Sequence, residues 1–220
     1  MTRRVVLGAA ALAAAALATT GLVAALSGRP LAYLTREPGA AVWIDGCSGH
    51  DCAYAGLLSL FGYLAWASGA TFCFLGAALT PAPPGGRRAS PLLWGGLVTL
   101  MLLADDMLMV HDDGLYGLAP GNDWAVVLAY AVVAGAVAWC FRAFLRTQPA
   151  WLLGISVGLF AVSIAADKFL PGRHALEDGA KFVGIVAWAA FFALAAVPAL
   201  HAAPEAGRPG EPRLPARPPP

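Results

Sequence analysis

Two aspartates occur inside a stretch that still has to be a membrane-crossing helix. Asp105 and Asp106 follow the apolar run Pro91–Ala104, which covers only about 21 Å of a hydrocarbon layer about 30 Å thick, so the helix must continue through them. A charged aspartate at the centre of a bilayer costs about 2.5 to 3.5 kcal/mol, and such residues usually face a bundle interior, a partner or water. We therefore expect Asp105 and Asp106 to belong to a functional site, with one of them acting as a base.

More acidic side chains lie on the same face if this helix continues to Asp112. The following residues fall within an arc of about 120° on a helical wheel: Asp105, Asp106, Met109, Asp112 and Asp113. His111 points well away from this arc. The pattern predicts a carboxylate-rich face near the outer end of the helix.

The start of the last apolar segment carries a second polar group. Lys181 lies between Glu177 and Asp178 around the helical wheel, so these three side chains can form a salt-bridged turn. If this stripe meets the aspartate face, Lys181 becomes the counter-charge for Asp105 or Asp106. We predict that pairing.

Carboxylates combined with two histidines suit a hard or borderline divalent ion such as Mg²⁺, Mn²⁺ or Zn²⁺. The expected catalytic residues are Asp105, Asp106 and Lys181, and the expected metal ligands are His111, Asp112, His174, Glu177 and Asp178. The spacing does not select a metal, and the chain has no HExxH or GxSxG motif. The alternative is that the charges near headgroup level, with Asp113, Asp167 and Lys168 among them, are ordinary interfacial residues.

Composition places the chain in a membrane. Of its 220 residues 59% are hydrophobic and only 12% are charged, and the mean hydropathy is +0.68. Soluble proteins carry about 25% charged residues. The net charge of +1 and the absence of zinc-finger, P-loop and Rossmann patterns argue against a nucleic-acid partner, so the lipid bilayer is the expected one.

The apolar runs predict an all-α bundle of six transmembrane helices in a single domain over residues 1–200. The expected helices are 5–26, 54–80, 91–112, 124–145, 149–166 and 176–200, and residues 201–220 are expected to form a disordered tail. Small residues in 54–80, and the pair Gly154 and Gly158, predict close helix contacts.

Most of the 14 lysines and arginines fall in loops that this arrangement puts on one side, which by the positive-inside rule is cytoplasmic. Both termini are therefore predicted to be cytoplasmic, in a bacterial plasma membrane. The first segment has two interpretations: an uncleaved anchor, or a signal peptide with Arg3 and Arg4 as its basic region and small residues near Ala24 and Ala25 for cleavage.

The four cysteines divide into two kinds. Cys47 and Cys52 lie in a polar loop that the topology exposes to an oxidising compartment, and we predict a disulfide between them. Cys73 and Cys140 lie inside apolar segments and are expected to be reduced packing residues.

The pattern Asp105-Asp106, His111-Asp112 and Glu177-Asp178-x-x-Lys181 resembles an uncharacterised group of bacterial multi-pass membrane proteins. Members of that group often have Asp-Glu, His-Glu and Glu-Glu-x-x-Lys at these places, so aspartate replaces glutamate here at several positions. The resemblance covers about half of the chain and implies no established activity.

Three functions fit these residues. The first is a metal-dependent hydrolase that acts on a lipid-like substrate at the outer leaflet. The second is a proton- or cation-coupled transporter, although the chain shows no inverted repeat of broken helices. The third is a structural or partner-binding membrane protein in which the charges hold helices together.

Overall fold

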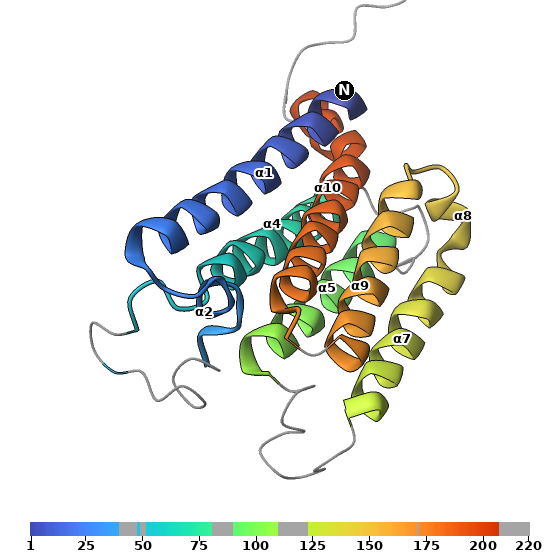
Figure 1. Ribbon diagram of the computed structural model, residues 1–220. Coiled ribbons are helices and arrows are strands. Elements are labelled where there is room, and N and C mark those ends of the chain that lie inside the picture. Colours follow the sequence, from blue (N-terminus) through green and yellow to red (C-terminus); the bar gives the residue numbers. More distant parts are fainter. Residues whose placement is uncertain (40–47, 49–51, 81–89, 110–122, 171, 207–220) are drawn as a thin grey trace, which may run out of the picture.

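The structure, a computed structural model, describes residues 1–39, 48, 52–80, 90–109, 123–170 and 172–206. These residues are largely helical and contain no strand, which confirms the all-α class. In chain order the helices are α1 (Thr2–Ser27), α2 (Leu31–Thr35), α4 (Leu57–Leu79), α5 (Pro91–Leu108), α7 (Asp123–Cys140), α8 (Arg142–Leu145), α9 (Trp151–Phe169) and α10 (His174–Ala206). Consecutive long helices run in alternate directions, so the start of α1 and the end of α10 lie at the same end of the bundle (Figure 1).

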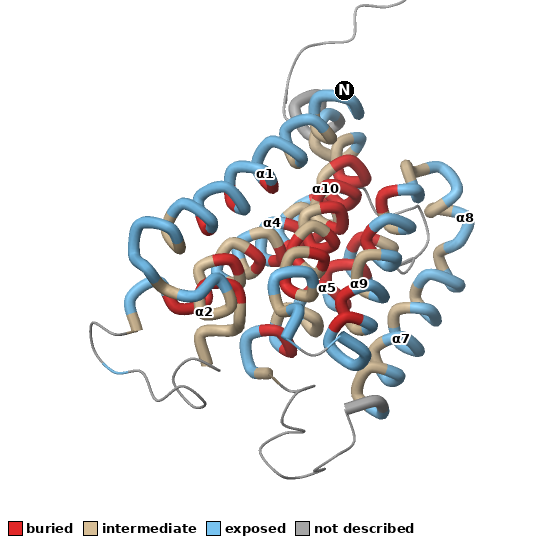
Figure 2. The backbone as a smooth tube through the Cα atoms, in the orientation of Figure 1, coloured by how far each residue is buried: buried red, intermediate tan, exposed pale blue. Residues whose placement is uncertain are grey.

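Helix α10 is the centre of the bundle. It packs against α1, α2, α4, α5 and α9, and buried residues are concentrated on it and on the helix faces around it (Figure 2). Phe191 and Ala196 are completely buried. Helices α1 and α7 are mostly exposed and lie on the outside of the bundle (Figure 2).

Small residues of α4 allow α10 to approach closely, as the sequence predicted. A Cβ added at Gly69 would lie 3.4 Å from Ala189 Cα, and one at Gly76 would lie 3.2 Å from Ala196 Cα. The prediction for α9 is wrong, because a Cβ added at Gly154 or Gly158 would meet no described atom within 4 Å. The GxxxG spacing of α9 therefore serves no packing contact in the described part of the chain.

Helix α5 begins as the sequence suggests and ends early. The Ser90 hydroxyl accepts a hydrogen bond from the backbone N–H of Leu93 (3.3 Å), and Pro91 occupies the first turn. Met109 has a left-handed backbone (φ 52°), and its N–H bonds to the carbonyl of Asp105, which ends the helix at Leu108. The predicted helix to residue 112 is thus too long, and Asp112 and Asp113 of the predicted arc lie outside the described residues.

The other helix ends also differ from the predicted ones. Phe141 interrupts the fourth predicted segment between α7 and α8. Helix α9 continues to Phe169, so Asp167 and Lys168 are helical and not in a loop. Helix α10 begins at His174 and continues to Ala206, six residues into the segment predicted to be a tail. Residues 207–220 lie outside the described residues.

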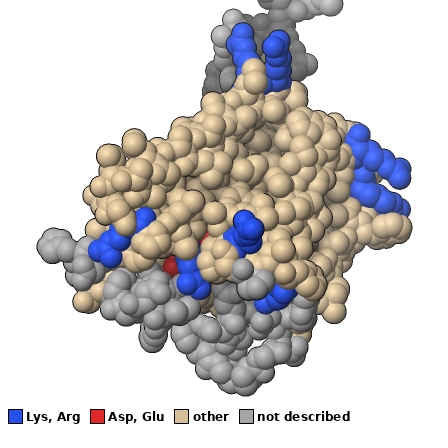
Figure 3. Space-filling model, in the orientation of Figure 1, with Lys and Arg blue, Asp and Glu red and all other residues tan. Residues whose placement is uncertain are grey.

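Five helices, α1, α4, α5, α9 and α10, are long and apolar enough to cross a membrane, and the apolar helix Ala125–Cys140 is shorter. Large apolar side chains point away from the bundle, such as Leu12 (72% exposed) and Leu128 (63% exposed). Lys and Arg gather toward the two ends of the face in Figure 3, and a belt without charges lies between them. Because exposed leucines in a charge-free belt suit acyl chains, the bundle is that of an integral membrane protein.

Candidate functional site

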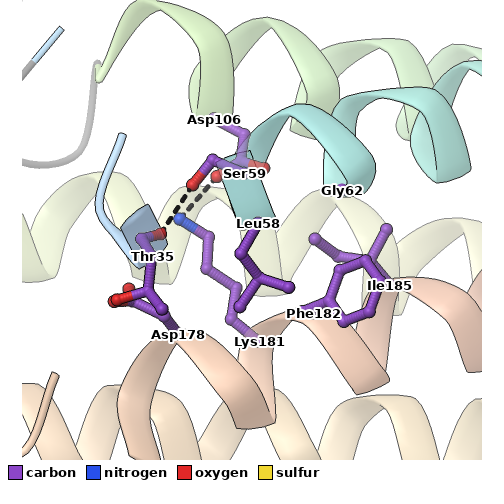
Figure 4. Close-up of a pocket in the computed structure, with 9 residues that line it drawn as sticks. All are labelled: Thr35, Leu58, Ser59, Gly62, Asp106, Asp178, Lys181, Phe182 and Ile185. Atoms are coloured by element: carbon purple, nitrogen blue, oxygen red, sulfur yellow. Dashed lines mark hydrogen bonds and ion pairs between the residues drawn. The ribbon is translucent and has the colours of Figure 1, made fainter. Parts of the chain in front are cut away.

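A three-residue ion-pair cluster joins three segments at one end of the bundle. The Lys181 ammonium, from the second turn of α10, lies 2.5 Å from Asp106 Oδ1 on α5 and 2.6 Å from Glu37 Oε1, just after α2. Lys181 also donates a hydrogen bond to Glu37, so its ammonium is shared between two carboxylates. Figure 4 shows the Lys181 side chain reaching from α10 toward Asp106. The predicted counter-charge for the aspartates is therefore in contact with Asp106.

Asp106 is held from its other side by two aromatic residues of α4. Trp66 Nε1 donates a hydrogen bond to Asp106 Oδ2 (3.2 Å), and the Tyr63 hydroxyl donates one to the backbone carbonyl of Asp106 (3.2 Å). Asp106 is only 5% exposed. Its carboxylate is thus fixed between a cation and an indole N–H, an arrangement that orients both oxygens.

Asp105 makes its hydrogen bond to a different helix from those that Asp106 contacts. The Tyr130 hydroxyl of α7 donates a hydrogen bond to Asp105 Oδ1 (3.0 Å). Adjacent residues on a helix are about 100° apart, so Asp105 faces α7 while Asp106 faces α4 and α10. The two aspartates therefore make hydrogen bonds to side chains of different helices.

Glu37 is a member of the cluster that the sequence pattern did not predict. Gly28 ends α1 with a left-handed backbone, and α2 then folds back so that Leu34 is completely buried. Two hydrogen bonds attach this turn to the start of α4: Ser59 Oγ donates to the Thr35 carbonyl (2.9 Å), and the Gly56 N–H donates to the Tyr33 carbonyl (3.1 Å). The sequence feature that could have revealed Glu37 is the short apolar run Leu31–Leu34, which precedes this acidic residue in a loop predicted to be polar.

Asp178 lies beside the cluster with an unpartnered oxygen. It is 7% exposed, and its Oδ2 has no hydrogen-bond partner among the described residues. Asp178, Asp106 and Lys181 line one cavity, with a volume of about 10 Å³. The cavity is lined by polar residues, Thr35, Ser59, Asp106, Asp178 and Lys181, and by apolar ones, Leu58, Gly62, Phe182 and Ile185 (Figure 4). This space accommodates about one water molecule.

Of the remaining predicted ligands, the structure describes His174 and Glu177, and neither lines this cavity. His174 Nδ1 lies 3.5 Å from Glu177 Oε2 on the first turn of α10, and both side chains are partly exposed. Lys168 pairs with its neighbour Asp167 (2.8 Å). His111, Asp112 and Asp113 lie outside the described residues. Within the described ranges, no three His, Cys, Asp or Glu side chains form a group that could hold a metal ion.

The cysteines differ in part from their predicted roles. Cys52 is disulfide-bonded; Cys47 lies outside the described residues, so its pairing with Cys52 stays a prediction. Cys73 is free and buried, as expected for a packing residue. Cys140 is free but exposed, so its predicted packing role is wrong.

Removing the indole N–H that holds Asp106 should weaken the protein. We expect Trp66→Phe to lower the free energy of unfolding by about 1.5 to 3 kcal/mol, because a hydrogen bond to a buried charged group is lost. The matched control is Trp94→Phe on α5, whose side chain is 44% exposed; it should change stability little. Thermal unfolding in detergent measures both, and equal losses would mean that the Asp106 contact contributes nothing.

Comparison with known proteins assigns the chain to a family. A family model described as a domain of unknown function (DUF8692) matches residues 5–195, which include the whole ion-pair cluster. The chain belongs to this family. The match extends from α1 into α10, so the DUF8692 domain comprises the membrane bundle. No curated protein and no solved structure matches the chain.

Proposed function

We propose that this DUF8692 protein crosses a bacterial plasma membrane six times with both termini in the cytoplasm, and that its ion-pair cluster lies toward the outer side. Two observations support this topology: the alternating helix directions (Figure 1), and the arginines of α8 at the end of the bundle where α1 begins and α10 ends. Helix α7 then serves as the remaining span, although it is shorter than the others.

Reporter fusions test this topology. Fusions after Arg88 and Arg146 should read cytoplasmic, and fusions after Gly117 and Arg173 should read external, because basic residues near helix ends are retained on the cytoplasmic side. An external signal after Arg88 would contradict the topology and would move the cluster to the inner side.

We further propose that Asp178, beside the ion-pair cluster, takes up and releases a proton, and that the protein couples this exchange to transport or to a conformational change. The observation that carries the proposal is Asp178: a buried carboxylate with an unpartnered oxygen, beside a cavity that accommodates one water and also borders Lys181 and Asp106. Burying an ionised carboxylate is costly when one of its oxygens has no hydrogen-bond partner, and a proton or a small cation relieves that cost. Buried ionisable residues in membrane helices commonly mark proton relays.

A metal-dependent hydrolase has less support from this geometry. The Lys181 ammonium occupies the place between two carboxylates where a divalent ion would bind, so the residues there fit a fixed ammonium better than a metal. The cavity of about 10 Å³ is also far smaller than a lipid headgroup. Bound metal that copurifies with the protein and is lost in Asp106→Asn would restore the hydrolase as the better candidate.

Infrared difference spectroscopy tests the proton site directly. Changing the pH of the purified protein should produce a carboxylic-acid C=O band that disappears in Asp178→Asn and remains in Asp167→Asn, whose side chain is 43% exposed in the native protein. In liposomes with an imposed potential, the wild type should move protons and Asp178→Asn should not. If no buried carboxyl titrates and no proton flux occurs, the cluster is structural and the coupling proposal fails.

A further inference from the structure

A second cavity lies between α5, α7, α8, α9 and α10, and it is almost entirely apolar. Its water-accessible volume is about 60 Å³. Val98 and Phe192 form part of its wall on the inside of the bundle, with Trp188 beside them, and Ala134, Val137 and Phe144 form part of its wall on the outside. A cavity with such a lining does not retain ordered water, and apolar groups bind there instead.

The outer wall of this cavity is loosely held. None of the described side chains of α7, from Ala125 to Cys140, is buried. Apart from isolated contacts, α7 packs against only two of the described helices, α5 and the following α8. Because the surrounding medium at this depth is hydrocarbon, the groups available to fill a gap beside α7 are acyl chains.

Two arginines lie next to lining residues of the cavity, in and directly after α8. Arg142 and Arg146 are exposed, and they alternate along the chain with the lining residues Phe141, Phe144 and Leu145. Arg142 donates a hydrogen bond to the Trp139 carbonyl (3.0 Å), and its guanidinium lies 4.8 Å from the centre of the Trp139 ring. These contacts hold one cation in place beside the apolar cavity, and Figure 3 shows a group of basic side chains over α8.

We propose that this cavity is a binding site for an anionic phospholipid. One acyl chain enters between α7 and the bundle, and the phosphate lies at Arg142 and Arg146. The apolar lining suits the chain, and the guanidinium groups suit a phosphate through charge-assisted hydrogen bonds. This proposal is independent of the proton site, because the two cavities have no lining residue in common.

Native mass spectrometry of the full chain with added phosphatidylglycerol or phosphatidylcholine of the same acyl chains tests the site. The wild type should retain phosphatidylglycerol in preference to phosphatidylcholine. Replacing both arginines by alanine should weaken phosphatidylglycerol binding about 25-fold, since each basic residue near an anionic lipid contributes about a factor of five. The control is the pair Arg3→Ala and Arg4→Ala, exposed residues at the start of α1, which should leave binding unchanged.

A second pair of variants tests the chain-binding part. Ala134→Phe fills the cavity and should weaken binding of both lipids, whereas Ala136→Phe, on the exposed side of α7, should not. Equal retention of the two lipids by the wild type, or equal losses in the α8 and α1 arginine variants, would overturn the proposal. If Ala134→Phe fails to fold, the arginine variants still decide the question, because they alter only exposed side chains.

Discussion

Replacing Lys181 by methionine should lower the free energy of unfolding by about 3 to 5 kcal/mol, because the change leaves Asp106 buried without its cation. Glu37 loses its hydrogen-bond donor in the same variant. The matched control is Lys168→Met: this lysine pairs with Asp167 on a partly exposed surface, and such pairs contribute at most about 1 kcal/mol. Denaturant or thermal unfolding in detergent measures both variants.

Removing the unpaired charge should restore stability. Asp106→Asn combined with Lys181→Met should recover part of the loss, and adding Glu37→Gln should recover more, because Lys181 contacts both carboxylates. Similar small effects for Lys181 and Lys168, with no recovery in the combined variants, would mean that the ion-pair cluster does not hold the three segments together. The site assignment would then have to be abandoned.

Gly56→Ala should be nearly as destabilising, through the backbone. Gly56 has a left-handed backbone (φ 63°), and an added Cβ would lie 2.5 Å from Pro38 Cδ and 2.7 Å from the Arg36 carbonyl oxygen. The backbone strain costs about 1 to 2 kcal/mol and the overlap about 1 to 3 kcal/mol more. The control, Gly28→Ala, has the same backbone strain (φ 69°) but no atom within 4 Å, so it should show the first cost alone.

The position of the overlap adds a second expectation for Gly56→Ala. Arg36 and Pro38 flank Glu37, so displacing them should also weaken the contact between Glu37 and Lys181. In a Glu37→Gln background the cost of Gly56→Ala should therefore be smaller than in the wild type. Strict additivity of the two changes would show that the turn does not position Glu37.

The sequence predicted the long helices well and the segments between them poorly. Long apolar runs predict helices because no other structure satisfies the backbone in a hydrocarbon layer. The end of α5 was misplaced because the apolar residues Met107 and Leu108 continue the run, and nothing in it reveals the left-handed backbone of Met109. Helix α2 was missed because only five residues form it, too few for a periodic signal, and its position depends on contacts with α4.

The sequence predicted the contact between Lys181 and an aspartate of α5, but it did not predict the other contacts of the site. Lys181 and Asp106 were expected to meet because the predicted topology puts the C-terminal end of α5 and the N-terminal end of α10 on the same side of the membrane. The separate roles of Asp105 and Asp106 depend on which neighbour each faces, and the spacing alone does not determine that. Glu37 comes from a turn far away in the chain, so no local pattern links it to Lys181.

The central position of α10 has a consequence for how the protein is made. The helix around which the others pack leaves the ribosome after all of them, and at about 5 to 20 residues per second Lys181 is synthesised about 4 to 15 s after Asp106. During that interval the earlier helices have no central partner, and Asp106 has no ammonium. A chain that terminates before α10 therefore has Asp106 in an incomplete bundle without the Lys181 ammonium, and a charged aspartate at membrane depth is costly without a partner.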